Sequence, residues 1–279
     1  MLAFSSLLGN VEGQNIYRIW YDKPASYWEE ALPVGNGRIA AMVFGDPQLE
    51  QIQLNEETVS AGSPYQNYNE EAKTALPEMR RLIFEGKYEE AQNMAATKIL
   101  SQVGNEMPYQ TVGRLNIRYQ DHKKVNNYYR DLDISNAVAV TRYEVDGVEF
   151  TEETFASFTD QLVIRHIKAS KPGAINCELF FNTPMRDPKR SIYGKKGLRL
   201  EGITHGSRYF PGKVHYCADL DVKHKGGKVI TANDTLLSVQ GASELTLYIS
   251  MATNFVNYKD ISGDPYQRNK AYLKNAAKD

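Results

Sequence analysis

Alternating apolar and polar residues dominate the chain beyond residue 110. Residues 138–145 and 148–150 alternate in this way across Asp146-Gly147, a pair that strongly favours a tight β-hairpin turn. The same period of two recurs in residues 162–167, 175–181, 197–202, 214–222, 228–230, 236–239 and 244–250. Many short strands separated by turn residues favour a sandwich over a βαβ sheet. We therefore predict a mainly β protein built as a large antiparallel β-sandwich.

The first third of the chain adds strands around a glycine turn. Residues 16–21 have the composition of a strand, and residues 31–45 contain Gly35-Asn36-Gly37 ahead of a second apolar run. Glycine accepts positive φ, so these residues predict a tight reversal that leads into a strand. Residues 51–54 continue the extended run.

Residues 76–100 have apolar side chains at helical spacing instead. Pro77 favours a helix start and Gly86 a helix end, and residues 87–100 repeat the helical pattern. We expect a short helical insert of two helices, packed on the sheets through its apolar stripe. Residues 265–277 indicate the beginning of a further helix.

Charge and hydropathy exclude two classes of partner. The chain has 33 Lys and Arg against 34 Asp and Glu, so it lacks the basic excess that nucleic acid requires. No apolar stretch approaches 20 residues, and we expect no membrane span. The apolar start at residues 1–9 resembles the tail of a secretory signal without its charged front, which predicts a secreted or periplasmic protein. A frayed terminus is the alternative.

The two cysteines are too few for a disulfide framework. Cys177 shares a predicted strand face with apolar residues, so we interpret it as a buried thiol. A bridge between Cys177 and Cys217 is the alternative.

Several ordered segments resemble glycoside hydrolase family 95, the α-L-fucosidase type. WEEALPVGNGRIAAM at 28–42 and IQLNEET at 52–58 are similar to its N-terminal signature. Matching blocks follow at 76–92, 109–115, 129–133, 146–157 and 252–266. The sequence departs from the family pattern at Ile39-Ala40 (usually Leu-Gly), at Ser60 (usually Trp) and at Gly113-Arg114 (usually Gly-Asp).

This resemblance implies an N-terminal β-supersandwich, a helical linker, a catalytic (α/α)6 barrel and a C-terminal β domain. It divides the chain into a signal-peptide remnant at 1–13, the supersandwich at 14–255 and the start of the linker helix at 256–279, with the barrel absent. The full-length enzyme would be an inverting α-L-fucosidase acting on oligosaccharides that end in α-1,2-linked L-fucose or in α-L-galactose. Its acid and base lie in the barrel, so we expect no catalytic residue here, and the barrel and the oligosaccharide are the expected partners.

Four residues of the signature are candidates for facing substrate or the barrel: Asn36, Arg38, Asn55 and Glu56. Ordinary turn chemistry is the alternative for each. Asn55 and Glu56 follow an apolar strand at a predicted loop entry, and Arg38 has the geometry to pair with a carboxylate across a domain interface.

The other chemistry-bearing residues indicate structure rather than catalysis. Glu152 and Glu153 point to opposite faces of a strand, and we expect these and other carboxylates such as Asp131 and Asp133 to be surface groups. The five histidines lack the spacing of a metal site, and we expect no metal and no cofactor. Trp20 is assigned to the core, and Trp28 to the core or an interface. A self-standing carbohydrate-binding or assembly module is the alternative function.

Overall fold

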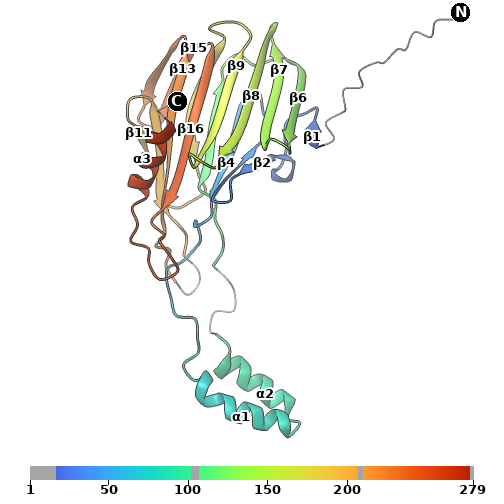
Figure 1. The fold of residues 1–279 in the computed structure, drawn as a ribbon, viewed down its shortest axis with the longest axis vertical. Coiled ribbons are helices and arrows are strands. Elements are labelled where there is room, and N and C mark those ends of the chain that lie inside the picture. The colour runs from blue at the N-terminus through green and yellow to red at the C-terminus, as the bar shows by residue number, and fades with distance from the viewer. Residues whose placement is uncertain (1–16, 102–106, 207–209, 277–279) are drawn as a thin grey trace, which may run out of the picture.

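Two antiparallel β-sheets face each other and form the body of the protein (Figure 1). The structure is a computed structural model that describes residues 17–101, 107–206 and 210–276, so the predicted signal remnant at 1–13 lies outside the described residues. In spatial order the nine-stranded sheet consists of β1 (Arg18–Tyr21), β6 (Val125–Asp133), β7 (Val138–Val145), β8 (Val148–Ser157), β9 (Leu162–Ala169), β16 (Glu244–Thr253), β13 (His215–Lys225), β12 (Gly197–Ile203) and β11 (Lys189–Tyr193). The seven-stranded sheet consists of β14 (Lys228–Asn233), β15 (Leu236–Ala242), β10 (Ile175–Asn182), β5 (Gly113–Tyr119), β4 (Leu49–Glu56), β3 (Ile39–Val43) and β2 (Leu32–Gly35).

The predicted sandwich is confirmed, because the alternating residues bury one face of each strand. In β4, Ile52 and Leu54 point inward and are fully buried, and Leu247 and Ile249 of β16 are buried in the same core. Cys177 and Cys217 are both buried and free, so the predicted thiol is confirmed and the alternative of a bridge between them is wrong.

Both predicted turns are confirmed by backbone angles. Asp146 and Gly147 have φ values of 51° and 72°, as a two-residue hairpin between β7 and β8 requires. Gly37 has a φ of 94° between β2 and β3, and the Asn36 amide donates to the Ile39 carbonyl at 3.1 Å. The chain thus reverses where the glycines permit it.

The helical insert exists, but its boundaries and its packing differ from the prediction. It consists of α1 (Ala72–Phe84), α2 (Tyr88–Met94) and a π turn, η2 (Ala95–Ile99), which we call the helical arm. Pro77 lies inside α1 rather than at its start. The helix begins earlier because the side chain of Asn69 accepts the Glu71 amide at 3.0 Å, which starts a turn ahead of it.

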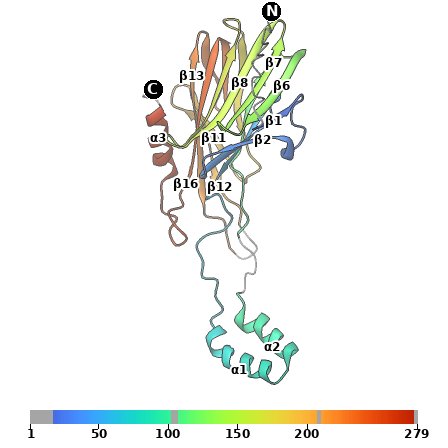
Figure 2. The ribbon, with the colours of Figure 1, turned by 45° about the vertical axis from the view of Figure 1, so that its right-hand side comes forward.

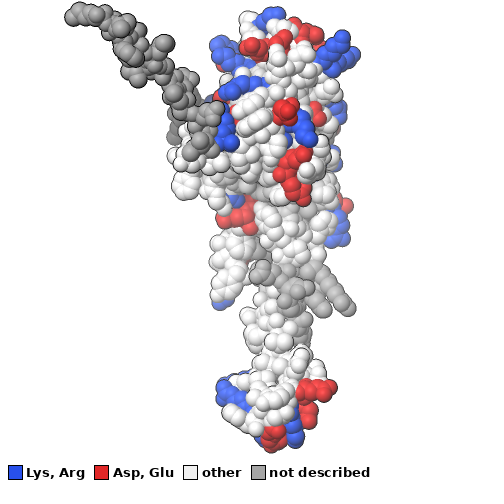
Figure 3. Space-filling view, turned by 90° about the vertical axis from the view of Figure 1, so that its right-hand side faces the viewer, with Lys and Arg blue, Asp and Glu red and all other residues white. Residues whose placement is uncertain are grey.

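The helical arm stands away from both sheets, so the expectation that it packs on them is wrong (Figures 1 and 2). Its helices bury Ala75, Leu82 and Ala91, whereas Phe84 and Tyr88 are 89% and 69% exposed. The apolar side chains of the stripe are covered within the arm itself, because α1 packs on α2 and η2. Figure 3 shows charged side chains on the arm and over much of the sandwich, and few in the narrow stretch that joins them.

The segments that carry the helical arm are paired where they leave the sandwich. The Ala61 amide donates to the Pro108 carbonyl at 2.9 Å, and the Gln110 amide donates to the Val59 carbonyl at 2.8 Å. We call this end of the sandwich the stalk end.

A third helix, α3 (Pro265–Ala276), lies against β13 and β16 of the nine-stranded sheet (Figure 1). Helix α3 falls where the sequence indicates a helix start. None of the helices in the described residues is long and apolar enough to span a bilayer. A short 3-10 turn, η1 (Trp28–Glu30), precedes β2. Trp20 is 61% exposed, so its assignment to the core is wrong; it stacks on Tyr129 at the sheet edge instead.

A buried ionic cluster joins the two sheets. Arg165 of β9 pairs with Glu152 of β8 and, at 3.1 Å, with Glu50 of β4, and all three side chains are inaccessible to solvent. Tyr119 and Tyr143 donate to Glu152 at 2.5 and 2.7 Å. Two carboxylates thus share one guanidinium inside the core.

The prediction that the carboxylates lie on the surface is therefore wrong for Glu152, Asp131 and Asp133, which are all buried. Asp131 and Asp133 pair with Arg18 at 3.3 and 3.2 Å. Glu153 points to the opposite face from Glu152 and is exposed, as predicted.

The ionic cluster predicts a pH-dependent stability. Burial, reinforced by the charge on Glu152 and opposed by Arg165, raises the pKa of Glu50 from 4.5 to about 7. The folded protein therefore binds this proton more tightly than the unfolded chain, and stability falls as pH rises from 4.5 through 7. We expect urea unfolding from pH 4 to 8 to show a loss on the order of 3 kcal/mol in wild type relative to Glu50→Gln. Glu153→Gln, on the exposed face, should keep the wild-type slope; equal slopes in wild type and Glu50→Gln would contradict the assignment.

The helical arm should be removable without loss of the sandwich. Replacing residues 66–106 by a short Gly-Ser linker keeps the backbone pairs at Ala61 and Gln110. Loop length changes closure entropy only slowly, so the free energy of unfolding should change by less than about 1 kcal/mol. Thermal unfolding followed by circular dichroism tests this, and a shortened chain that fails to fold would show that the arm supports the core.

Candidate functional site

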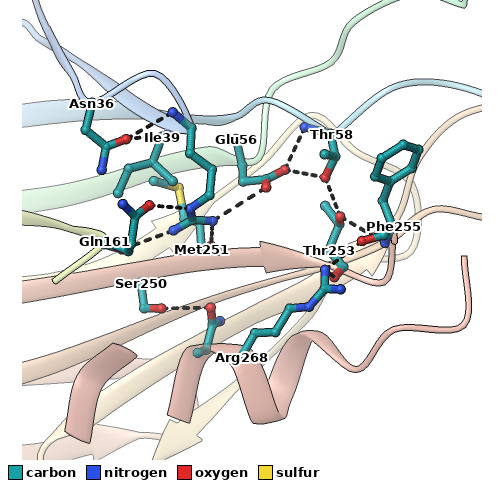
Figure 4. Close-up of polar contacts among 12 residues, drawn as sticks. Asn36, Ile39, Glu56, Thr58, Gln161, Ser250, Met251, Thr253, Phe255 and Arg268 are labelled. Carbon is teal, nitrogen blue, oxygen red and sulfur yellow. Dashed lines mark hydrogen bonds and ion pairs between the residues drawn. The ribbon is translucent and has the colours of Figure 1, made fainter. Parts of the chain in front are cut away.

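The four predicted site residues lie at the stalk end of the sandwich. Asn36 and Arg38 belong to the turn between β2 and β3, and Asn55 and Glu56 are the last two residues of β4. Asn55 is therefore in a strand, paired with Ala40, and not at a loop entry. Figure 4 shows the polar contacts that join this corner to the other sheet.

Asn36 shapes the turn and connects it to the nine-stranded sheet. Its side-chain oxygen accepts the amides of Arg38 and Ile39, both at 3.0 Å. Its Nδ2 donates to the carbonyl of Ser157 at the end of β8, at 2.9 Å. The turn chemistry predicted as the alternative for Asn36 is thus present, together with an inter-sheet contact.

Arg38 connects three parts of the fold through one guanidinium. It donates through Nε to the Gln161 side chain at 2.6 Å and through Nη2 to the Gln161 carbonyl at 3.1 Å. Nη1 donates to the Met251 carbonyl of β16 at 2.8 Å and lies 3.5 Å from Glu56. The guanidinium also covers the ring of Tyr272 in α3, 4.7 Å from its centroid. The carboxylate partner of Arg38 is therefore Glu56 of the same domain, and not a residue across a domain interface.

Glu56 is nearly inaccessible, with 4% of its surface exposed. Its Oε2 accepts the Thr58 amide and hydroxyl at 2.8 and 2.6 Å, and the Thr58 hydroxyl shares a hydrogen bond with that of Thr253 in β16. Burial raises the pKa of Glu56, although the Thr58 hydrogen bonds and Arg38 oppose the shift. Asn55 points to the opposite face of β4, so three of the four predicted residues come together and the fourth does not.

Helix α3 is held at the same corner by buried polar contacts. Arg268 donates to the carbonyls of Thr253 and Phe255 at 2.9 and 2.7 Å. Asn269 accepts from the Ser250 hydroxyl at 2.7 Å and donates to the Cys217 carbonyl at 3.0 Å. These contacts hold α3 against β13 and β16 of the nine-stranded sheet.

A cavity of about 670 Å³, the stalk-end groove, opens beside this network. Apolar side chains make up much of its lining, which consists of Glu57, Thr58, Ser60, Ala61, Ser63, Pro64, Tyr65, Asn67, Met107, Val214, Phe255, Tyr258 and Ile261. Tyr258 is 74% exposed. Glu57 is the sole carboxylate among these lining residues.

The polar side chains at this corner hold parts of the fold together and do not form a catalytic pair. An inverting glycosidase uses two carboxyl groups roughly 6.5–9.5 Å apart that face one sugar. Here both oxygens of Glu56 face groups of the protein, and Glu57 lies in the turn after β4, where it lines the stalk-end groove without a second carboxylate. Across the part of the chain that the structure describes, no cluster of three His, Cys, Asp or Glu side chains has the geometry to hold a metal ion.

The residues of these polar networks differ in the signal that the sequence carried for them. Gln161, Thr58, Thr253 and Arg268 lie outside the glycine turn and gave no local pattern. Glu50 and Glu56, however, are in phase with the buried Ile52 and Leu54 of β4. Strand phase alone therefore places both glutamates on the inward face.

Loss of Arg38 should destabilise the fold. Arg38→Ala removes contacts to Gln161 and Met251 and leaves Glu56 buried without its cation, which should lower the free energy of unfolding by roughly 2–4 kcal/mol. Arg38→Lys should recover part of this, because lysine keeps the charge but not the planar set of donors. Denaturant unfolding measures both.

Arg142→Ala is the matched control, since Arg142 is exposed on β7, and its effect should stay within about 0.5 kcal/mol. If Arg38→Ala is as stable as this control, Arg38 does not connect the sheets in solution.

The chain matches a family model over most of its length. Residues 19–258 match the model described as "Glycosyl hydrolase family 65, N-terminal domain". The chain is 31% identical over 271 residues to "Alpha-L-fucosidase 2" of Arabidopsis thaliana, covering 88% of this chain and 31% of that protein. It is 22% identical over 272 residues to "Probable alpha-fucosidase A" of Aspergillus oryzae, covering 93% of this chain and 36% of that protein.

The chain thus spans about a third of the length of these curated relatives. The resemblance to N-terminal domains of family 95, α-L-fucosidase-type glycoside hydrolases is confirmed by these matches, although the family model itself carries the number 65. The chain belongs to the family of glycosyl hydrolase N-terminal domains that this model describes.

Proposed function

We propose that the chain is the non-catalytic N-terminal domain of a glycoside hydrolase. The full-length form is an inverting α-L-fucosidase that removes terminal α-1,2-linked L-fucose, or α-L-galactose, from oligosaccharides. The names of the relatives and the share of their length that the chain covers support this proposal.

One structural observation carries the non-catalytic part. Two cavities larger than 600 Å³ in the described part of the chain each have a single carboxylate among their lining residues, Asp46 in one and Glu57 in the other. A glycosidase acid and base must face the same sugar. Neither cavity supplies such a pair.

The proposed partner is the (α/α)6 barrel, packed against the stalk end. The stalk-end groove offers an apolar surface with Tyr258 and Val256 exposed by 74% and 46%, and such surfaces favour protein contacts. Helix α3 begins at Pro265, four residues after Ile261 of this groove and within the proposed linker at 256–279. Asn36, Arg38 and Glu56 would then hold the two sheets in place under this surface without contacting the barrel. Asn55 lies on the outer face of β4.

The alternative of a self-standing carbohydrate-binding or assembly module has less support. Both relatives align with this chain as part of a protein about three times as long. Sugar binding by this domain is nevertheless compatible with a role inside a longer enzyme.

Activity assays separate the two parts of this proposal. The proposed full-length protein, in which the barrel follows this domain, should release fucose from 2′-fucosyllactose with inversion, as followed by NMR of the anomeric proton. Purified residues 1–279 should release none. Turnover by residues 1–279 would place the acid and base in this domain, and a full-length protein inactive on both fucosides and α-L-galactosides would reject the proposed reaction.

A further inference from the structure

A second large cavity lies on the outer face of the seven-stranded sheet. We call it the outer groove: a cavity of about 620 Å³ whose wall is formed by residues 23–28 and whose floor is formed by Phe44, Asp46, Gln51 and Arg114. Gln51 and Arg114 alternate with the buried Ile52 and Leu115, so they point away from the core. The outer groove therefore takes no part in the stalk-end network.

Two aromatic rings stand exposed on the wall of the outer groove. Tyr27 and Trp28 are 57% and 49% exposed, so Trp28 is not a core residue. Aromatic rings with one free face bind flat apolar surfaces, and the C–H face of a pyranose ring is such a surface. Tyr27 and Trp28 provide this contact at one end of the groove.

The floor offers the hydrogen-bonding groups that sugar hydroxyls need. Arg114 donates to the Gln51 side-chain oxygen at 2.5 Å and lies over the Phe44 ring, 5.7 Å from its centroid. This contact leaves further guanidinium N–H groups and the Gln51 amide N–H₂ as donors, and Asp46 adds an acceptor. The lining holds two cations, Lys23 and Arg114, and one carboxylate, Asp46, so a net charge of +1 remains and a sugar would be bound through stacking and hydroxyl groups rather than through charge.

The binding surface extends beyond one ring. A smaller, neighbouring cavity of about 290 Å³ shares Arg114 with the outer groove and is lined by Gln53, Thr111 and Asn182 among others. Gln51 and Gln53 are two residues apart on the same face of β4, about 7 Å along the strand. The two cavities together follow β4 and favour a chain of sugars over a monosaccharide.

The wall is held in place before any ligand arrives. The fully buried Arg130 donates to the carbonyls of Lys23 and Glu30, both at 2.7 Å, and the Ala25 amide donates to the Phe44 carbonyl at 2.9 Å. The Ser26 amide donates to the Glu30 carboxylate at 2.8 Å. A preorganised wall lowers the entropy cost of binding.

We propose that the outer groove binds a neutral oligosaccharide, with Trp28 and Tyr27 stacking on one sugar ring and Gln51, Asp46 and Arg114 binding its hydroxyl groups. The choice of a fucosylated ligand rests on the proposed function, whereas the binding of a sugar in the outer groove is inferred from the lining of the groove alone. Arg114 stands where the family pattern usually has Asp, so its part of the site is a property of this chain, whereas Trp28 belongs to the signature block at 28–42.

The chain's two tryptophans allow a direct test. Trp20→Phe leaves Trp28 as the sole tryptophan, and Trp28→Phe leaves Trp20, which lies on the edge strand β1 outside the groove. Titration of the Trp20→Phe protein with 2′-fucosyllactose should shift its emission saturably, with a Kd in the millimolar range or below. The emission of the Trp28→Phe protein should not shift.

Calorimetry on residues 1–279 measures affinity independently of fluorescence. Trp28→Ala and Arg114→Ala should each weaken binding of 2′-fucosyllactose about tenfold, whereas Trp20→Ala should leave it unchanged. Raising the salt concentration should have little effect on a neutral ligand.

Equal affinity in Trp28→Ala, Arg114→Ala and wild type would overturn the proposal, because the sugar would then bind elsewhere. Absence of binding to the wild-type chain at 20 mM 2′-fucosyllactose would overturn it as well. Neither result touches the proposed function, which depends on turnover by the full-length enzyme.

Discussion

The inward face of β4 controls how the two sheets are joined. It consists of Glu50, Ile52, Leu54 and Glu56, two apolar residues between two buried carboxylates. Glu50 pairs with Arg165, which belongs to the nine-stranded sheet. Glu56 pairs with Arg38, which donates to the Met251 carbonyl of that sheet. Burial of an unpaired carboxylate is costly, so both pairs favour a single alignment of the sheets while the apolar core supplies most of the burial energy.

The two ends of β4 differ in what they position. The Glu50 end is sealed among tyrosines inside the core. The Glu56 end reaches the surface through Arg38, Thr58 and Thr253, near the place where the segments of the helical arm leave the sandwich and Arg268 holds the start of α3. A rigid corner beside an apolar groove is what a domain needs to hold a neighbour in fixed orientation, and the outer groove remains free for a ligand.

Alternation and turn residues act locally, so the sequence indicated most of the strands, although β5, β6 and β11 were not singled out. The Asp146-Gly147 hairpin and the glycine turn at Gly37 follow from φ preferences of single residues. Packing of the helical arm did not follow, because an apolar stripe does not say whether a sheet or a second helix covers it. Arg38 was recognisable as a candidate, but Gln161 and Met251 meet it only through the tertiary fold. Trp20 lies in a strand that was predicted, but it is exposed because that strand forms the edge of its sheet, and the sequence does not show which strands are edges.

Hydrogen–deuterium exchange on residues 1–279 and on the full-length protein tests the central claim that the stalk end is a docking surface for the barrel. The account predicts slower exchange in the full-length protein at residues 57–68 and 255–262, and unchanged exchange at residues 23–28 of the outer groove. Unchanged exchange at the stalk end, or protection confined to residues 23–28, would contradict it.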